Sequence, residues 1–352
     1  MRPQIRYICP KCHSTGLVEK EGRLSCGSCN SMWNFSGGIT DLGGDLPYYG
    51  ELPKEQMRVI IQEAENKGWK LALFNNFYNS YNYLYIIATW ETRADWLYFL
   101  GLNGNESVLD VGSGWGSEAI PLARNSARVA AFDSTLERLE FLMIRAEQEG
   151  VDNITGVKGS ILAPPFEAEQ FDIVVLNGVL EWIGLADEAK APLELQRLAL
   201  KNVHRLLKKG GRLYLGIENS HGFKYLLGEP DDHTGISNIT FLERRNADNI
   251  MLSLRDRPYR TYTHSFSGYE NLLRDVGFDK FEFYYPYPDY KTFSILSPIA
   301  DSGPYRYFLE HLCTDSESGS LKQNIKNLET SALEEGFLKE HVSSYAIIAE
   351  KG

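Results

Sequence analysis

A cluster of glycines follows an acidic residue in the segment SVLDVGSGWGSEAIPLA, residues 107–123. The glycines are Gly112, Gly114 and Gly116, and Asp110 stands two residues before the first of them. An apolar run precedes them and a helix-like segment follows, which is the order of the first strand, turn and helix of a doubly wound nucleotide-binding sheet. Glycines let a backbone approach a ligand without a Cβ clash, and the N–H groups that open a helix favour an anionic group. The segment therefore predicts a ligand-binding turn.

The spacing D-x-G-x-G-x-G differs from the G-x-G-x-x-G of dinucleotide-binding turns. It resembles motif I of the class I methyltransferases that use S-adenosylmethionine (SAM). The resemblance implies SAM as the cofactor, with Gly112, Ser113, Gly114 and Gly116 against the ligand. It also implies that Asp110 orients the turn or receives the ammonium group of the ligand. The alternative is an ordinary glycine-rich connection between a strand and a helix.

A second acid stands at the end of the next predicted strand. Asp133 follows the run RVAAF and lies 21 residues after Gly112, a position that suits the two ribose hydroxyls of an adenosine. Ser134-Thr-Leu-Glu137 has the pattern of a capping box, so we expect Ser134 to cap the following helix and Asp133 to stay free for the ligand. Ser134 is also counted among the residues expected at the cofactor.

Three further positions complete the expected cofactor site. The family that the sequence resembles has an acid after its third strand, facing the adenine amino group. The matching position here is Ser160, whose oxygen can accept a hydrogen bond from that amine. Ile161 is expected to line the adenine face. Asn177 ends the buried run FDIVVL and is expected to bind the methionine amine, with a purely structural role as the alternative.

Four of the five cysteines form two C-x-x-C pairs, Cys9 with Cys12 and Cys26 with Cys29, separated by 13 residues. This spacing suits one tetrahedral structural zinc ion, whereas a disulfide pair would need an oxidising compartment. The segment is similar to the zinc module of some rRNA guanine methyltransferases, and to a free-standing partner of tRNA and protein methyltransferases. A domain this small needs a metal to fold, so we expect a structural role or a dock for a protein partner.

Histidines and aspartates gather after the run RLYLGIEN, in the segment ENSHGFKYLLGEPDDHTG. Loops at the carboxyl ends of such strands bind substrates, and a hydroxyl acceptor needs a base, which histidine supplies near neutral pH. We therefore expect His233 as the base, Asp232 as the residue that orients it, and His221 as a further catalytic candidate. The alternative is a polar surface turn. The segment, together with YPYPDYK at 285–291, is similar to bacterial methyltransferases found with surface-glycan synthesis, which implies a saccharide acceptor.

The elements around these residues predict an α/β fold. We expect a doubly wound, seven-stranded SAM-methyltransferase sheet that ends in a C-terminal antiparallel hairpin, with a small N-terminal zinc ribbon before it. The ribbon is expected at 1–45, a linker and capping helices at 46–100, and the methyltransferase domain at 101–352. Two insertions are expected in this domain, at about 219–263 and 286–340, the second with a loose loop at DSESGS.

The length and the net charge of the chain limit the classes of function that it can have. The 352 residues suffice for about two domains, and the net charge of −11 argues against general binding to nucleic-acid backbones. The sequence has no apolar run of 18 residues and no signal-peptide core, so we expect no membrane span and a cytoplasmic protein. The predicted activity is methyl transfer from SAM to a saccharide or small-metabolite hydroxyl. The alternatives are an RNA base as the acceptor, or a non-catalytic SAM-binding scaffold that recruits a partner through the zinc ribbon.

Overall fold

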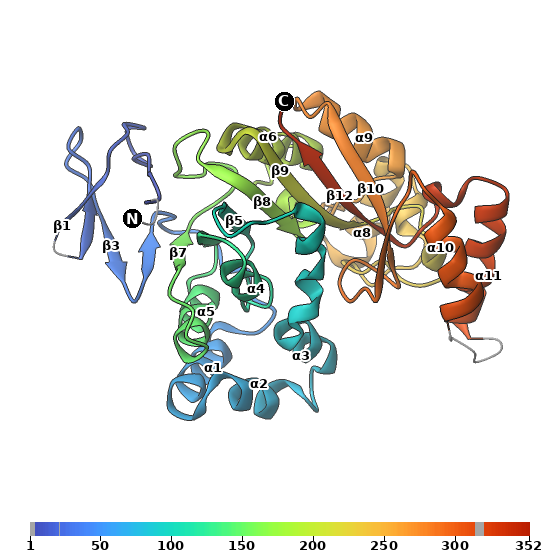
Figure 1. Ribbon diagram of the computed structural model, residues 1–352, viewed down its shortest axis with the longest axis horizontal. Helices are drawn as coiled ribbons and strands as arrows, with labels where there is room; N and C mark the ends of the chain where they lie inside the picture. The colour runs from blue at the N-terminus through green and yellow to red at the C-terminus, as the bar shows by residue number, and fades with distance from the viewer. Residues whose placement is uncertain (1–3, 21, 314–319) are drawn as a thin grey trace. The chain divides into compact units, whose positions relative to one another are not determined.

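The computed structural model describes residues 4–20, 22–313 and 320–352. The chain folds into two compact units, which are described one at a time (Figure 1). Unit 1 comprises Met1–Leu176, Asn202–Leu213 and Lys351–Gly352, and unit 2 comprises Asn177–Lys201 and Tyr214–Glu350. Most of the predicted DSESGS loop, residues 315–319, lies outside the described part of the chain.

Twelve strands follow one another in the order β1-β2-β3-β4-β7-β6-β5-β8-β9-β12-β10-β11. The prediction of seven strands is therefore wrong in number. The seven predicted strands form the middle of this order, from β7 to β10, while β1–β4 and β11 extend it. The strands are β1 (Val18–Lys20), β2 (Arg23–Ser25), β3 (Met32–Ser36), β4 (Ile39–Asp41), β5 (Ser107–Val111), β6 (Arg128–Asp133), β7 (Ile154–Lys158), β8 (Phe171–Asn177), β9 (Leu207–Glu218), β10 (Lys280–Tyr287), β11 (Ile295–Pro298) and β12 (Ser344–Glu350).

Strand β5 is the centre of the parallel sheet in unit 1. All five of its residues are buried, and it pairs in parallel with β6 on one side and with β8 on the other. Strand β7 pairs in parallel with β6. Parallel strands are usually covered on both faces, which explains the nearly continuous apolar runs in the sequence. The carboxyl ends of these strands lie at one edge, where the glycine turn after β5 meets Asp133 at the end of β6.

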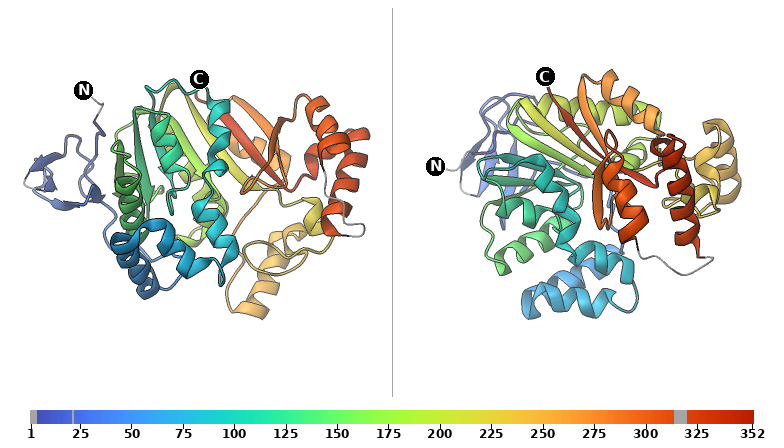
Figure 2. Two further views of the ribbon diagram at one scale, coloured as in Figure 1. Left: turned by 60° about the horizontal axis from the view of Figure 1, so that its bottom comes forward. Right: turned by 45° about the vertical axis from the view of Figure 1, so that its right-hand side comes forward.

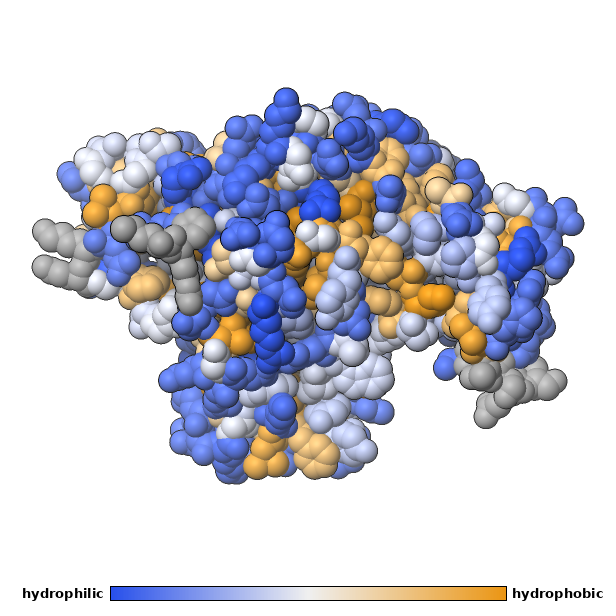
Figure 3. Space-filling view, in the orientation of Figure 1, coloured by the Kyte–Doolittle hydropathy of each residue, from blue (hydrophilic) through white to orange (hydrophobic). Residues whose placement is uncertain are grey.

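The first three helices of unit 1 stay side by side in every view (Figures 1 and 2). Their buried faces pack together with Trp115 of the glycine turn and with Phe141. Figure 3 shows apolar side chains exposed at the bottom of that view. In α2, Leu71 and Phe74 are 46% and 45% exposed. The helices of unit 1 are α1 (Lys54–Lys67), α2 (Trp69–Phe77), α3 (Asn82–Thr89), η1 (Glu91–Leu100), α4 (Ala119–Arg124) and α5 (Leu136–Gln148).

The short N-terminal strands join the parallel sheet of unit 1 directly. Strands β1, β2 and β3 pair antiparallel, β3 pairs antiparallel with β4, and β4 pairs in parallel with β7. Ile39 of β4 lies opposite Gly156 of β7, and a Cβ atom added at Gly156 would lie 2.9 Å from Ile39 Cγ1. The close approach of the two strands therefore needs a glycine at this position. The cysteine module extends the sheet instead of standing apart from it.

Unit 2 contains the predicted C-terminal antiparallel pairing. Strand β10 pairs antiparallel with β12 and, on its other side, with β11. The helices are η2 (Leu180–Leu185), α7 (Phe223–Leu226), η3 (Ile239–Phe241), α8 (Arg244–Arg255), α9 (Phe266–Asp275), α10 (Gly303–Tyr307), η4 (Phe308–Leu312), α11 (Leu321–Glu334) and η5 (Leu338–Glu340), while α6 (Pro192–Leu206) runs from unit 2 into unit 1. Across the described residues, no helix combines the length and hydropathy that a bilayer span requires.

Candidate active site

The glycine turn of unit 1 adopts a backbone that side chains disfavour. Gly112, Gly114 and Gly116 have φ angles of 72°, 51° and 84°, in the left-handed region that glycine enters without strain. The Gly112 N–H donates to the Phe132 carbonyl over 2.7 Å, which ties the turn to the end of β6. A Cβ atom added at Gly116 would lie 3.0 Å from Leu142 Cγ of α5. The turn is longer than predicted, since α4 begins at Ala119 and not near Gly116.

The Asp133 carboxylate holds this turn in place through hydrogen bonds from backbone N–H groups. Its Oδ2 accepts a hydrogen bond from Gly114 N over 3.0 Å, and its Oδ1 accepts one from Thr135 N over 2.9 Å. The expectation that Ser134 caps the next helix is wrong, because α5 begins at Leu136, Thr135 is its N-cap residue, and the Thr135 side chain makes no capping hydrogen bond. The Asp133 carboxylate bonds the N–H of Thr135 instead. Asp133 is therefore not free, and a ligand must use the lone pairs that these two bonds leave on it.

Asp110 and Ser113 carry polar atoms that are buried without a hydrogen-bond partner among the described residues. Asp110 is 2% exposed and its Oδ2 has no partner, and Ser113 Oγ is in the same state. Burial, followed by the nearby Glu118 and Asp133 carboxylates, raises the pKa of Asp110 well above its usual range, although Arg93 opposes the shift. A buried acceptor without a partner fits a ligand that brings its own cationic donor. The ammonium group of SAM is such a donor.

Ser160 and Ile161 follow β7 at the same edge of unit 1. The Gly159 N–H donates to the Asp133 carbonyl over 3.0 Å, which places this segment beside Asp133. Ser160 Oγ accepts a bond from Leu162 N over 3.3 Å, and Ile161 is 4% exposed. Unit 1 thus brings together every predicted cofactor residue except Asn177. That residue ends β8 in unit 2, where an added Cβ atom at Gly216 would overlap its amide.

A buried cluster of charged side chains surrounds His233 in unit 2. Its Nε2 lies 3.7 Å from Glu181 Oε1 and 3.8 Å from Glu218 Oε2, and its Nδ1 lies 3.3 Å from Asp231 Oδ1. All four side chains are at most 2% exposed. Burial alone would lower the pKa of His233, but the three carboxylates outweigh it and raise this pKa to about 10. Burial and Glu218 raise the pKa of Glu181. The alternative of a polar surface turn is therefore wrong for His233 and Asp231, whose side chains are buried.

Asp232 does not orient His233, contrary to expectation. Its carboxylate accepts hydrogen bonds from Lys224 Nζ over 2.6 Å and from Tyr225 Oη over 2.5 Å, and it lies 3.3 Å from Lys291 Nζ. Burial opposes ionisation, but the two lysines hold the pKa of Asp232 well below its usual range. Successive side chains of the turn point apart, so Asp231 contacts the imidazole and Asp232 contacts the lysines.

His221 takes a separate position in unit 2. Its exposed ring stacks on Phe241 with the centroids 5.8 Å apart. Burial, followed by the neighbouring His341, lowers the pKa of His221. Sequence reasoning did not identify Glu181 and Asp231 as the partners of His233. Glu181 lies 52 residues away in the chain, and Asp231, two residues away, stands beside a second acid, Asp232. Only the fold shows which acids come close to the imidazole.

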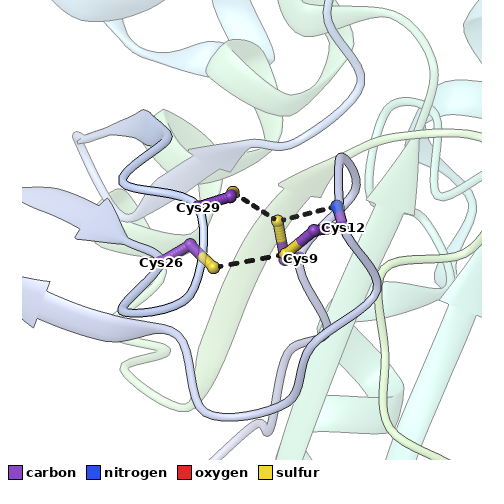
Figure 4. Close-up of side chains that lie close together, drawn as sticks. All are labelled: Cys9, Cys12, Cys26 and Cys29. Carbon is purple, nitrogen blue, oxygen red and sulfur yellow. Dashed lines mark hydrogen bonds between the residues drawn. The ribbon is translucent and has the colours of Figure 1, made fainter.

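The four N-terminal cysteines lie together in unit 1, as their spacing predicts (Figure 4). The Cys9 and Cys29 sulfurs are 3.6 Å apart, and so are the Cys12 and Cys26 sulfurs. All four sulfur atoms lie within 4.8 Å of one another. The Cys12 N–H donates to Cys9 Sγ over 3.3 Å, the bond type that stabilises a thiolate in such a knuckle. The donor set and its spacing fit one tetrahedral zinc ion.

Comparison with known proteins finds a family model whose matched range includes the glycine turn. Residues 102–224 match the family described as "Methyltransferase domain". The demethylmenaquinone methyltransferase of Lactococcus lactis is 29% identical over 156 residues, which cover 42% of this chain and 58% of that protein. The ribosomal RNA small subunit methyltransferase G of Deinococcus deserti is 34% identical over 83 residues, which cover 22% of this chain and 34% of that protein. The chain therefore spans less than two thirds of the length of either relative.

Solved structures align with the chain at low identity and low TM-score. YcgJ of Bacillus subtilis is 17% identical with a TM-score of 0.40, covering 74% of this chain and 97% of that one. Phosphoethanolamine N-methyltransferase 2 of Haemonchus contortus is 15% identical with a TM-score of 0.44, covering 86% of this chain and 61% of that one. The glycine turn and Asp110 lie inside residues 102–224, the range that matches a methyltransferase domain.

Proposed function

We propose that this protein is an enzyme that moves the methyl group of SAM to a hydroxyl group of a saccharide or small metabolite. The observation that carries the acceptor class is the buried cluster in which His233 faces Glu181, Glu218 and Asp231. Transfer to a hydroxyl requires the loss of a proton, and a buried cluster of acceptor atoms can receive it. The other acceptor classes are outcomes of the experiment below.

The cofactor is proposed to bind at the glycine turn of unit 1. When bound, SAM supplies a methyl group on a sulfonium, which is already an activated electrophile. Asp110 would accept from the ammonium group through the oxygen that lacks a partner, and Asp133 would accept from the ribose hydroxyls. Ser160 and Ile161 would border the adenine. Gly112, Gly114 and Gly116 have no Cβ atom, which lets a ligand approach the backbone closely.

The acceptor is proposed to lose its proton to the His233 cluster. Glu181 Oε2 and Glu218 Oε2 are candidate proton acceptors, and both lack a hydrogen-bond partner among the described residues. His233 Nε2 is the third candidate, and it can accept only after it has passed on the proton that its raised pKa retains near neutral pH. Asp231 is a positioning residue, because it contacts Nδ1 and so fixes the ring. Asp232 is also a positioning residue, through its lysine partners.

The cysteine cluster is proposed to hold a structural zinc ion. The four sulfurs already lie at the separations given above, and the module offers few other buried side chains for a core. A protein partner could dock on this module. Its resemblance to the zinc module of rRNA guanine methyltransferases favours an RNA base as the second acceptor candidate.

The test is transfer of radiolabelled methyl from SAM into fractionated cell extract by the full chain. Label in a nuclease-resistant saccharide or metabolite fraction is the expected result. Label that nuclease releases from RNA would replace the proposed acceptor with an RNA base. SAM binding without transfer to any fraction would show a non-catalytic scaffold.

A matched pair of histidine variants tests the role of the cluster. His233→Gln removes the buried imidazole, whereas His311→Gln removes an exposed one in the same unit, on η4. Loss of a proton acceptor should lower the transfer rate by about 10²–10⁴-fold with SAM binding retained. Equal rates for the two variants would refute the acceptor chemistry and leave cofactor binding in unit 1 untouched.

A further inference from the structure

We propose that Glu181, Glu218 and His233 form a binding site for one divalent first-row metal ion, of the Mn²⁺ or Zn²⁺ class. This site is distinct from the four cysteines. The inference goes beyond the proposed methyl transfer and does not depend on it. In the ion-bound form Nε2 of His233 is a ligand, so the proton-accepting role belongs to the ion-free form.

The three ligand atoms come from separate segments of unit 2 and converge on one point. Glu181 lies on η2, Glu218 is the last residue of β9, and His233 lies in the turn after α7. One nitrogen and two carboxylate oxygens lie within 4.8 Å of one another. Nε2 lies 3.7 Å from Glu181 Oε1 and 3.8 Å from Glu218 Oε2, which exceeds the spacing of about 3.3 Å around a tetrahedral ion by only a few tenths of an ångström. The unpartnered Oε2 of Glu181 belongs to the same carboxylate and is the atom proposed as its ligand.

Two buried oxygens point to a missing ligand. Glu181 Oε2 and Glu218 Oε2 have no hydrogen-bond partner among the described residues, and both side chains are 1% exposed. Their other oxygens are occupied, since Tyr290 Oη lies 3.5 Å from Glu181 Oε1 and 3.2 Å from Glu218 Oε1, and Lys291 Nζ lies 2.5 Å from the latter. A buried carboxylate oxygen left without a partner is costly, and a cation removes that cost.

The charge of the cluster matches a divalent ion. Two ammonium groups face four carboxylates, which leaves two negative charges. A protonated His233 offsets one of them in the ion-free form, and an ion of charge +2 that replaces this proton balances both. The groups are Lys224 and Lys291 against Glu181, Glu218, Asp231 and Asp232.

The types of the three ligand atoms indicate which kind of ion the site prefers. An imidazole nitrogen with two carboxylates suits Zn²⁺, Mn²⁺ or Fe²⁺ better than Mg²⁺ or Ca²⁺, which prefer oxygen alone. Asp231 supplies the usual outer partner of a metal-bound histidine, because its Oδ1 lies 3.3 Å from the opposite ring nitrogen. Thr234 holds Asp231 in turn, through its N–H at 3.0 Å and its hydroxyl at 2.7 Å.

The experiment uses the full chain with its cysteine module already loaded with zinc. Mn²⁺ is the probe, because four thiolates select Zn²⁺ over Mn²⁺. Free Mn²⁺ is measured by electron paramagnetic resonance as protein is added, and thermal unfolding is followed with and without Mn²⁺. We expect one Mn²⁺ per chain and a higher unfolding temperature when it is bound.

Three variants identify the ligands. Glu181→Gln keeps an oxygen acceptor for Tyr290 and should weaken Mn²⁺ binding by about tenfold or more, as should His233→Gln. Glu334→Gln changes an exposed acid of α11 and should bind as the parent does. If the parent shows no saturable site, or if all variants bind alike, the proposal is refuted. Because binding is the readout, this failure is distinct from a failure of methyl transfer.

Discussion

The most quantitative prediction concerns a buried acid of unit 2 outside the charged cluster. Glu329 of α11 is 3% exposed, and Tyr305 Oη donates a hydrogen bond of 2.9 Å to its carboxyl group. Burial raises the pKa of Glu329 from 4.5 to about 7, although the bond from Tyr305 opposes the shift. Between these two values the unfolded chain has lost the proton while the folded chain keeps it. Stability therefore falls as the pH rises through this window.

The size of the effect follows from the shift. At 1.36 kcal/mol per pKa unit, Glu329 lowers the free energy of unfolding by about 3 kcal/mol once the pH is above 7. Glu329→Gln cannot ionise, and its side-chain oxygen still accepts the bond from Tyr305. From pH 5 to pH 8, the stability of this variant relative to the parent should rise by about 2–3 kcal/mol.

Urea denaturation followed by circular dichroism measures this difference, because urea leaves the ionic strength unchanged. Glu334→Gln, at an exposed position of the same helix, is the matched control and should show a flat difference across the same pH range. A flat difference for Glu329→Gln as well would contradict the reasoning. It would mean that the carboxyl group reaches water in the folded chain.

The remaining predictions test the glycine turn and the cysteine module. Gly116→Ala should lower the free energy of unfolding by about 1–3 kcal/mol, because its Cβ would crowd Leu142 and a left-handed φ strains alanine; a loss under about 0.5 kcal/mol in urea denaturation would be inconsistent with this packing. Metal analysis should find one zinc per chain bound at the cysteines, and none in Cys26→Ser; full zinc content in that variant would exclude a four-cysteine site. Chelation of the zinc should speed hydrogen exchange in β2 and β3 more than in β5, since only the former depend on the metal for a core; equal protection before and after chelation would count against a structural ion.

The parts of the site that depend on neighbouring residues in the chain could be predicted from the sequence. The glycine turn, the strand before it and the two cysteine pairs each have a spacing that only a few local structures satisfy. The positive φ angles at Gly112, Gly114 and Gly116 are what such a pattern requires. The close approach of the four sulfurs follows in the same way from two C-x-x-C knuckles.

The parts that depend on long-range contacts could not be predicted. A capping box predicts Ser134 as the cap, but a local pattern cannot show that α5 begins one residue later, or that the Asp133 carboxylate accepts from both Gly114 N and Thr135 N. Likewise, alternation within a turn leaves open which of Asp231 and Asp232 faces the histidine.

The predicted number of strands is too low for a related reason. The short strands of the cysteine module carry too few apolar residues to predict their pairing. The pairing of β4 with β7 depends on Gly156, which by its sequence alone is an unremarkable residue inside a strand.

Calorimetric titration of the full chain with SAM tests the central claim most directly. One site of micromolar affinity is expected. Asp133→Asn should weaken it by about 10–100-fold, because a carboxylate bond to the ribose hydroxyls contributes about 1.5–3 kcal/mol. Asp45→Asn, at an exposed position of unit 1, should bind as the parent does. No binding by the folded parent, or equal binding by Asp133→Asn, would contradict a cofactor site at the glycine turn.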